Sequence, residues 1–181
     1  PDVAALALTA YTNGRAQNLS GSSVFTVIGF SQTSVNRRLW TVDMATGALL
    51  VNDRVAHGSG SNSANDPALA DTFSNTPGSN MSSLGLCLTA ETYDGSNGYS
   101  LRLDELEDSN DNMRSRAIVV HGAWYVEDEF VAQNGYAGRS NGCPALALSR
   151  SAAFIDVIKD GTLMFAYYPD TAWLNSSPFL K

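Results

Sequence analysis

Short runs of β-branched, aromatic and aliphatic residues recur along the chain, separated by stretches rich in Gly, Ser, Asn and Asp. Runs of this kind predict β-strands, and the residues between them predict turns. The predicted strands cover residues 24–28, 38–43, 48–51, 84–89, 99–103, 117–121 and 162–168. The turn Ala45-Thr46-Gly47 joins the second and third runs as a hairpin, and we expect the third run to continue through His57 to Gly58.

Two other segments predict helices at the margins of these strands. Residues 2–11 are rich in Ala and Leu, with Asp2 as a helix cap and Asn13-Gly14 as the stop signal. Residues 149–158 begin with Ser149 as a cap and are followed by Gly161. The pattern therefore predicts a mainly β fold, with an N-terminal helical segment at 1–23, a β-rich domain at 24–168 and a C-terminal tail at 169–181.

Two long polar segments interrupt the predicted strands. Residues 58–83 are rich in Ser, Asn, Asp and Gly, and residues 127–142 form a second loop that leads to Cys143. Loops this long inside a compact domain are more often functional than merely connecting. We expect Phe73 to anchor the first loop to the body of the domain. A shorter turn is predicted at 93–98, beginning at Tyr93.

Composition narrows the classes of function. The chain has 181 residues, 44% of them hydrophobic, which is enough for one domain with a real core. Its 11 basic and 18 acidic residues give a net charge of −7, which disfavours nucleic acid as a partner. No apolar run reaches the roughly 18 residues of a membrane-spanning helix, and the first residues lack the basic start of a signal peptide.

The chain contains two cysteines, Cys87 and Cys143, and two histidines, His57 and His121. None of them lies in the ligand spacing of a known metal motif, so we expect no metal and no cofactor. Cys87 lies within an apolar run, which is typical of a buried cysteine that packs in the core and has no chemical role. A Cys87–Cys143 bridge stays open as an alternative, because spacing alone does not decide connectivity.

Cys143 lies in the turn Gly138-Arg139-Ser140-Asn141-Gly142-Cys143-Pro144 rather than in an apolar run. This setting predicts an accessible thiol that can act as a nucleophile. Pro144 has no N–H, so donors to a developing oxyanion must come from Cys143, Gly142 or Asn141. Arg139 is near enough in sequence to favour a thiolate or to bind a substrate carboxylate.

His121 ends an apolar run and precedes Gly122, and His57 ends another and precedes Gly58. A cysteine nucleophile needs a base, and a histidine at the end of a strand is held rigidly at the rim of the sheet. We take His121 as the base and place His57 in the lining of the site. No acidic residue stands out as the third group, so a backbone carbonyl at His121-Gly122 is expected to orient the imidazole.

These residues resemble a known family. His121-Gly122 followed by Ser140-Asn141-Gly142-Cys143 is similar to the signature of the L,D-transpeptidase (YkuD-type) catalytic domain, and more closely to its murein L,D-transpeptidase branch. Further similar runs are Val55-Ala56-His57-Gly58-Ser59-Gly60-Ser61, Phe73-Ser74-Asn75, Ser82-Ser83-Leu84-Gly85, Arg116-Ala117-Ile118-Val119-Val120-His121-Gly122-Ala123 and Gly138-Arg139-Ser140-Asn141-Gly142-Cys143-Pro144-Ala145. The resemblance covers residues 24–168. Asn141 stands where the broader family often has a second histidine.

The resemblance implies a mixed β-sandwich or barrel-like catalytic domain with a few peripheral helices. It also implies that Cys143 is the nucleophile and His121 the base, that the Gly122 carbonyl orients His121, and that the Gly142 and Cys143 amides form the oxyanion hole. We add Arg139, Ser140, Asn141, His57 and Tyr93 as candidate substrate-binding residues.

The function implied is cysteine acyl transfer on peptidoglycan stem peptides, which forms L,D cross-links through a Cys143 thioester. The protein is then expected to be exported to the periplasm or cell envelope and to be a monomer. Two alternatives stay open: an L,D-carboxypeptidase or endopeptidase that hydrolyses the same substrates, and a non-catalytic wall-binding β domain. A papain-like protease fits less well, because its cysteine precedes its histidine.

Overall fold

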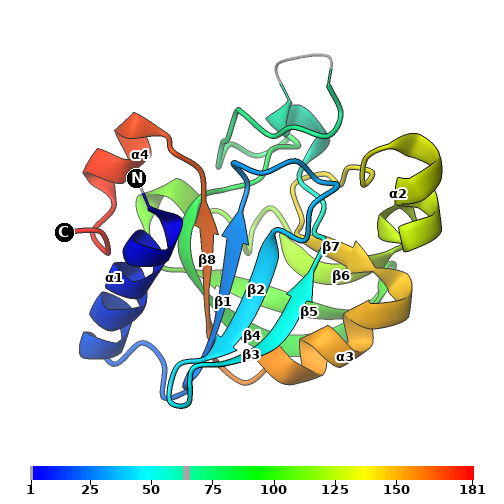
Figure 1. Cartoon of the computed structure of the whole chain (residues 1–181). Coiled ribbons are helices and arrows are strands. Elements are labelled where there is room, and N and C mark those ends of the chain that lie inside the picture. Colours follow the sequence, from blue (N-terminus) through cyan, green and yellow to red (C-terminus); the bar gives the residue numbers. More distant parts are fainter. Residues whose placement is uncertain (1, 63–65) are drawn as a thin grey trace.

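A computed structural model describes residues 2–62 and 66–181 of the protein (Figure 1). In these residues, eight strands form one sheet and four α-helices lie around it. The helices are α1 (Val3–Ala16), α2 (Asp128–Asn134), α3 (Leu148–Ile158) and α4 (Thr171–Ser176). The strands are β1 (Val24–Gly29), β2 (Leu39–Asp43), β3 (Ala48–Asp53), β4 (Gly85–Gly95), β5 (Gly98–Glu105), β6 (Val119–Ala123), β7 (Ala145–Ala147) and β8 (Leu163–Tyr167).

The sheet is mixed, in the order β3-β2-β1-β8-β4-β5-β6-β7. β1 pairs in parallel with β8, and β6 pairs in parallel with β7, while the other neighbours are antiparallel. The sheet curls into a nearly closed barrel, with α1 beside β8 and α3 against β6 (Figure 1). The predicted mainly β, barrel-like fold with peripheral helices is confirmed.

The two ends of the sheet approach each other next to the turn that precedes β7. The expected strand through His57 is wrong in its extent, because β3 ends at Asp53. The chain then crosses to the other end of the sheet, where the Ala56 N–H donates to the Ala145 carbonyl (2.8 Å) and the Ser140 N–H donates to the His57 carbonyl (2.9 Å). These bonds form a seam between residues 56–59 and 140–145, which nearly closes the barrel.

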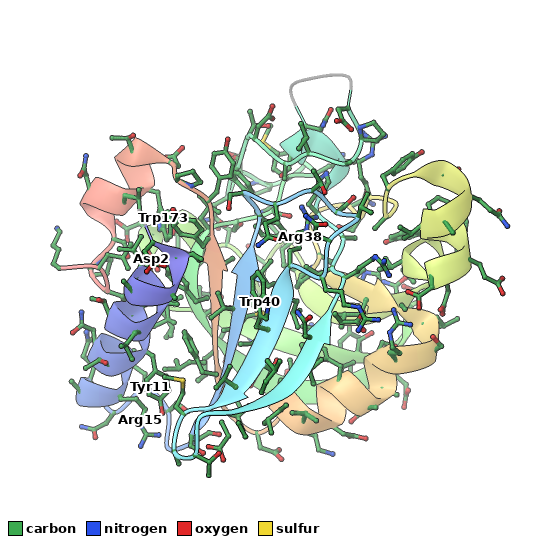
Figure 2. All side chains as sticks on the ribbon, viewed as in Figure 1. Asp2, Tyr11, Arg15, Arg38, Trp40 and Trp173 are labelled. Atoms are coloured by element: carbon green, nitrogen blue, oxygen red, sulfur yellow. The ribbon has the colours of Figure 1, made fainter. Side chains whose placement is uncertain are left out.

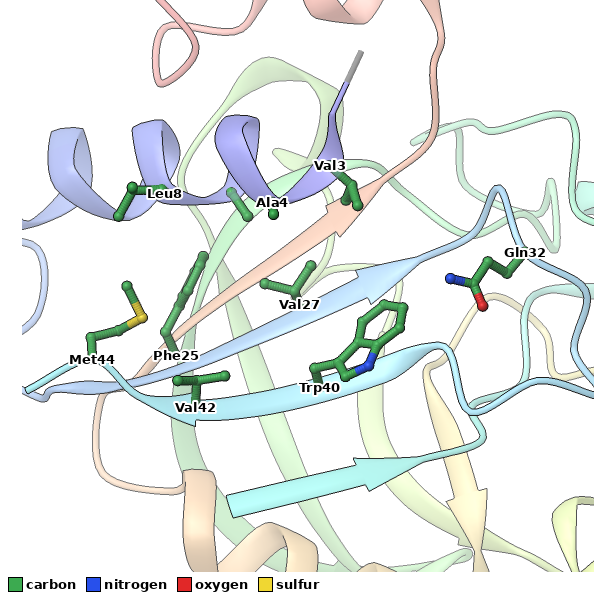
Figure 3. A pocket seen from close by; sticks show the side chains of 10 residues that line it. Val3, Ala4, Leu8, Phe25, Val27, Gln32, Trp40, Val42 and Met44 are labelled. Carbon is green, nitrogen blue, oxygen red and sulfur yellow. The ribbon is translucent and has the colours of Figure 1, made fainter. Parts of the chain in front are cut away.

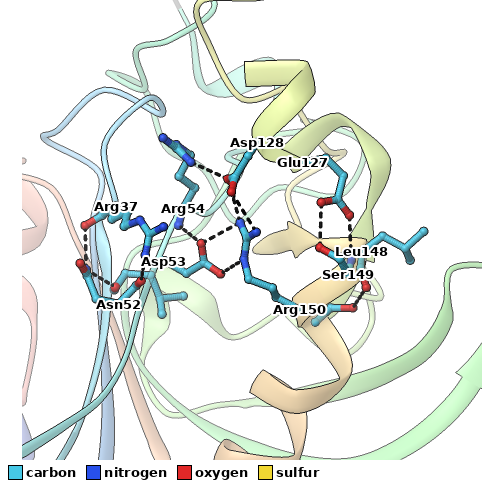
Figure 4. A network of polar contacts seen from close by, with 11 residues as sticks. Arg37, Asn52, Asp53, Arg54, Glu127, Asp128, Leu148, Ser149 and Arg150 are labelled. Carbon is cyan, nitrogen blue, oxygen red and sulfur yellow. Dashed lines mark hydrogen bonds and ion pairs between the residues drawn. The ribbon is translucent and has the colours of Figure 1, made fainter. Parts of the chain in front are cut away.

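A polar network reinforces this seam (Figure 4). The Arg150 guanidinium binds Asp53 at the end of β3 (Nε to Oδ2, 2.6 Å) and Asp128 at the start of α2 (Nη2 to Oδ1, 3.1 Å). Arg54 binds the same Asp128 carboxylate (2.7 Å). The network therefore links the last strand of one sheet end to the two helices that flank the other end.

The core is apolar and lies inside the curled sheet. Its largest fully buried apolar side chains include Phe165, Ile28, Leu86, Leu101 and Leu146. Phe73 packs between Phe30 and Tyr168, with ring centroids 5.6 and 4.9 Å away, so its predicted anchoring role is confirmed.

The C-terminal tail packs on the body of the domain. Trp173, which is labelled in Figure 2, and Phe179 join the core cluster. The Trp173 Nε1–H donates to the buried carboxylate of Glu107 (3.1 Å). Since an indole N–H is a donor that needs an acceptor when it is buried, this contact fixes α4 in place.

Several predicted helix boundaries are wrong. α1 continues through Asn13-Gly14 to Ala16, because Gly14 faces β4 and β8, where an added Cβ would lie 3.0 Å from Leu163 and 3.1 Å from Leu86. The predicted loop 127–142 contains α2, which ends at Gly135 with φ +77°.

α3 also begins earlier than expected, at Leu148. Ser149 is not its cap; the Ser149 N–H and hydroxyl instead donate to the Glu127 carboxylate (2.7 and 2.8 Å). The predicted end of this helix at Ile158 is confirmed.

Candidate active site

A polar cavity of about 400 Å³ opens beside β6 and the turn before β7. Its lining residues are Asn97, Arg116, Ala117, His121, Tyr125, Arg139, Ser140, Asn141 and Cys143. Five predicted site residues therefore come together here, namely Cys143, His121, Arg139, Ser140 and Asn141.

A second, apolar cavity of about 430 Å³ lies between α1 and the outer faces of β1 and β2 (Figure 3). Its walls include Leu8, Phe25, Trp40 and Met44, with Gln32 at one end. The described residues of its lining include no ionisable or nucleophilic side chain, so the chemistry expected from the sequence belongs to the polar cavity.

Cys143 precedes β7, and β6 runs alongside it. The Val119 N–H points at the Cys143 Sγ (3.5 Å), and the thiol donates to the Ala117 carbonyl (3.6 Å). Burial raises the pKa of the Cys143 thiol, while the Val119 N–H and the Arg116 charge act in the opposite direction with smaller effect. The resting sulfur is therefore a thiol at neutral pH, which means that the reaction needs a base. Both cysteines are free, so the alternative of a Cys87–Cys143 bridge does not apply.

His121 is in the middle of β6, opposite Ala145 of β7. Its Nδ1 lies 3.0 Å from the Gly122 carbonyl oxygen. Since a carbonyl only accepts, Nδ1 carries a proton, which leaves Nε2 as the ring nitrogen that can take up another one. Gly122 allows this close packing, because an added Cβ would lie 2.4 Å from the Ser151 hydroxyl of α3.

The turn before the cysteine is held by its own hydrogen bonds. The Gly142 N–H donates to the Ser140 hydroxyl oxygen (3.1 Å), and that hydroxyl donates to the Cys143 carbonyl (2.7 Å). Gly142 has φ +120°, and an added Cβ would lie 2.7 Å from the Met81 carbonyl oxygen. Only glycine fits this position without strain. The Gly142 amide expected in the oxyanion hole already has an acceptor.

The serine-rich loop packs against this turn. The Gly58 N–H donates to the Ser82 hydroxyl oxygen (3.0 Å), and the Ser82 hydroxyl donates to the Gly142 carbonyl (3.4 Å). The Ser82 N–H in turn donates to the buried Ser61 hydroxyl (2.8 Å). Residues 63–65 of the predicted loop lie outside the described residues.

Arg116 is a site residue that sequence reasoning missed. Its guanidinium donates to the Ser74 carbonyl (3.0 Å), the Ser83 hydroxyl (2.8 Å) and the Met81 carbonyl (2.6 Å). All three acceptors are neutral, so its positive charge is not cancelled by a bonded carboxylate. The available signal was an arginine directly before the apolar run that ends in His121.

The structure does not bring His57 or Tyr93 into the lining of the cavity. His57 has no exposed surface, and its Nδ1 accepts a hydrogen bond from the buried Arg38 (2.8 Å). Burial, together with the charges of Arg38 and Arg139, lowers the pKa of His57 to about 3, so the ring is neutral. Tyr93 lies under the guanidinium of Arg102, 4.3 Å from the ring centroid.

Over residues 2–62 and 66–181, no group of three or more His, Cys, Asp or Glu side chains is arranged to hold a metal ion. The same residues contain no helix that is long and apolar enough to cross a membrane.

Comparison with known families decides the identity. Residues 1–167 match the family described as the L,D-transpeptidase catalytic domain. The chain belongs to this family. The resemblance drawn from the His121 and Cys143 motifs is thereby confirmed. No curated protein matches the sequence.

Solved structures include chains that are similar to this domain at low identity. The helical cell shape determining protein of Campylobacter jejuni is 12% identical, with a TM-score of 0.50 over 89% of this chain and 54% of that chain. L,D-transpeptidases from Xylanimonas cellulosilytica and Mycobacterium smegmatis are 17% and 14% identical, each with a TM-score of 0.48 over 82% of this chain and 62% and 60% of theirs. The chain spans less than two thirds of each of these chains.

The raised pKa of Cys143 gives a testable pH dependence. The rate of alkylation by iodoacetamide should keep rising from pH 6 to pH 9, because the thiolate fraction grows throughout this range. Arg116→Gln removes a charge that lowers the pKa of Cys143, so at pH 8 alkylation should slow by roughly threefold or more. Arg116→Lys keeps the charge and should react like the wild type.

The exposed Arg37, which is outside the cavity lining, provides a matched control as Arg37→Gln. Equal rates for Arg116→Gln, Arg37→Gln and the wild type at every pH would contradict an electrostatic effect of Arg116 on the sulfur.

Proposed function

We propose that this L,D-transpeptidase domain is a cysteine acyltransferase that forms L,D cross-links between peptidoglycan stem peptides. The observation that carries the proposal is a single cavity lined by both Cys143 and His121, with the Nδ1 of His121 bound to the Gly122 carbonyl so that Nε2 is the nitrogen left to act as a base. Family membership supports the substrate class, because the family acts on peptidoglycan.

In the proposed first step, His121 Nε2 takes the proton of the Cys143 thiol as the sulfur attacks an amide carbonyl of the donor stem peptide. The tetrahedral intermediate then collapses, the C–N bond breaks, and the leaving amine takes the proton back from His121. The products of this step are a thioester that joins the shortened stem peptide to Cys143 and the released terminal D-residue, which carries the free amine.

In the second step, an amine of another stem peptide attacks the thioester. His121 removes a proton from this amine, and the thiol leaves as the new amide forms. The Gly122 carbonyl holds His121 in the same tautomer through both steps. We assign substrate binding to Arg139, Ser140 and Asn141, which line the cavity. His57 and Tyr93 are left out of the proposed site.

The test is to incubate the wild-type protein with a purified disaccharide tetrapeptide and to analyse both protein and peptides by mass spectrometry. We expect an acyl group on the proteolytic fragment that contains Cys143, together with cross-linked dimers. Shortened monomers alone would mean that water captures the thioester and that the enzyme is a hydrolase. Unchanged peptides and unmodified protein would contradict the enzymatic proposal and favour a wall-binding domain.

Because peptidoglycan is assembled outside the cytoplasm, the proposed reaction also supports a location in the periplasm or cell envelope.

A further inference from the structure

Acyl transfer by Cys143 places a negative charge on the former carbonyl oxygen of the substrate. Preorganised N–H or O–H donors that face this oxygen lower the barrier, and more than one donor is usual. The backbone around the sulfur offers few such donors. Pro144 has no N–H, the Gly142 N–H is given to Ser140 (3.1 Å), and the Val119 N–H points at the sulfur itself (3.5 Å).

Of the amides next to the sulfur in the chain or bonded to it, the Cys143 N–H is the donor that remains. Within residues 2–62 and 66–181, no acceptor pairs with it. The Ser82 hydroxyl donates to the Gly142 carbonyl, and a trans peptide holds its C=O and N–H in opposite directions. The Cys143 N–H therefore points away from Ser82 and its loop. Since more than one donor is usual in an oxyanion hole, we look for the second donor among the side chains of the cavity.

Tyr125 lines the cavity together with Cys143. It belongs to the short 3-10 turn Trp124–Val126 that follows β6 directly, so its backbone continues the strand that carries His121. No partner binds its hydroxyl in the described part of the chain. Burial, and to a smaller extent the charge of the Cys143 thiolate, raises the pKa of Tyr125 to about 12. The phenol thus keeps its proton and stays a donor throughout the physiological range.

The ring of Tyr125 is held on two sides. The Gly138 N–H donates to the Tyr125 carbonyl (2.7 Å), and an added Cβ at Gly138 would lie 2.6 Å from the Tyr125 Cβ and 2.8 Å from the ring. Trp124 contacts the ring edge to face, with centroids 5.8 Å apart. Arg139 and Asn141 also line the cavity, but their side chains are exposed. A donor that is already fixed costs less reorganisation during the reaction, which favours Tyr125 over both.

We propose that the Tyr125 hydroxyl is a catalytic donor that, with the Cys143 N–H, binds the oxyanion of the tetrahedral intermediate. This assignment rests on the acyl transfer proposed above. It takes the place of the Gly142 amide that the family resemblance implied.

The test compares two reactions of the same sulfur in wild type and Tyr125→Phe. Acylation by p-nitrophenyl acetate passes through an oxyanion, whereas alkylation by iodoacetamide does not. We expect Tyr125→Phe to lower the rate of acylation by about 10- to 100-fold and to leave the rate of alkylation within about twofold. Tyr136→Phe is the matched control, since Tyr136 packs against Phe130 outside the cavity lining and should match the wild type in both reactions.

Acylation of Tyr125→Phe at the wild-type rate would overturn the assignment. So would an equal loss of acylation and alkylation, since that pattern means that Tyr125 acts on the sulfur rather than on the oxyanion. A wild-type enzyme that reacts with the ester but leaves the stem tetrapeptide intact contradicts the proposed substrate and leaves the role of Tyr125 standing. Reaction with the ester therefore distinguishes a failure of the Tyr125 assignment from a failure of the proposed peptidoglycan substrate.

Discussion

Replacement of Cys143 by alanine is expected to abolish acyl transfer, with kcat/KM for the tetrapeptide falling by at least about 10⁴-fold. Among the described residues that line the cavity, Cys143 carries the only thiol, and no Ser or Thr hydroxyl is free to replace it, since the Ser140 hydroxyl is given to the Cys143 carbonyl. The fold should survive, because Cys143 is only partly buried. The loss is measured by the release of the terminal D-residue and by the absence of a protein adduct in intact mass spectra.

Cys87→Ala is the matched control for this substitution. Cys87 lies in β4 with 1% of its surface exposed, and burial raises the pKa of its thiol to about 12. Its replacement should lower the free energy of unfolding by about 1 kcal/mol, through a small cavity, and leave turnover per folded molecule unchanged. Residual adduct formation by Cys143→Ala at the wild-type rate would mean that the reactive group lies elsewhere.

Replacement of His121 by alanine should lower kcat for the tetrapeptide by about 10²- to 10⁴-fold, with a small change in KM. The physical reason is that burial keeps the Cys143 sulfur protonated at neutral pH, so that attack depends on a group that removes the proton. In the variant, activity should recover partly at high pH, where the thiol ionises without help. Steady-state rates from pH 6 to pH 10 check both expectations.

His57→Ala is the informative comparison, because both histidines have the same local sequence setting. His57 is fully buried and its Nδ1 is occupied by Arg38, so it has no path to the thiol proton. Its loss leaves a buried guanidinium donor unpaired, which should cost about 1–3 kcal/mol of stability, measured by denaturant unfolding. Turnover per folded molecule should fall far less than in His121→Ala. Comparable losses in the two variants would contradict His121 as the base.

These two histidines mark the limit of what sequence alone can predict here. Each ends an apolar run and precedes a glycine, so local pattern gives no reason to separate them. They differ in tertiary surroundings, since His121 reaches a cavity while His57 is enclosed with Arg38. The motif around Cys143 was more informative, because a cysteine among Gly, Ser and Asn predicts a turn, and the structure places that turn at the cavity.

In the fold, too, local sequence patterns predicted some elements and missed others. The apolar runs predicted β1, β2 and β8 well, because they are short runs of β-branched, aromatic and aliphatic residues, and Gly47 marked the turn of the β2–β3 hairpin. The helix α2 was missed because its residues are mostly polar, with Val131 as its buried side chain. The pairing of residues 56–58 with 140–145 joins segments more than eighty positions apart. No local pattern encodes such a pairing.

Arg116 and Tyr125 were missed for the same reason. Arg116 is held at the cavity by the Ser74, Met81 and Ser83 oxygens of a distant loop. Tyr125 lines a cavity wall that forms only when β6 meets the turn before β7.

Because of the seam between residues 56–59 and 140–145, the turn that carries Cys143 also helps to close the barrel. The Ser140 N–H is bound to the His57 carbonyl and the Ser59 N–H to the Ser140 carbonyl, so this turn cannot shift without opening the junction between the two ends of the sheet. The seam therefore fixes the position of the Cys143 sulfur relative to the barrel. Productive alignment must then come from motion of the incoming peptides, and tolerance to insertions in this segment should be as low as in the core itself.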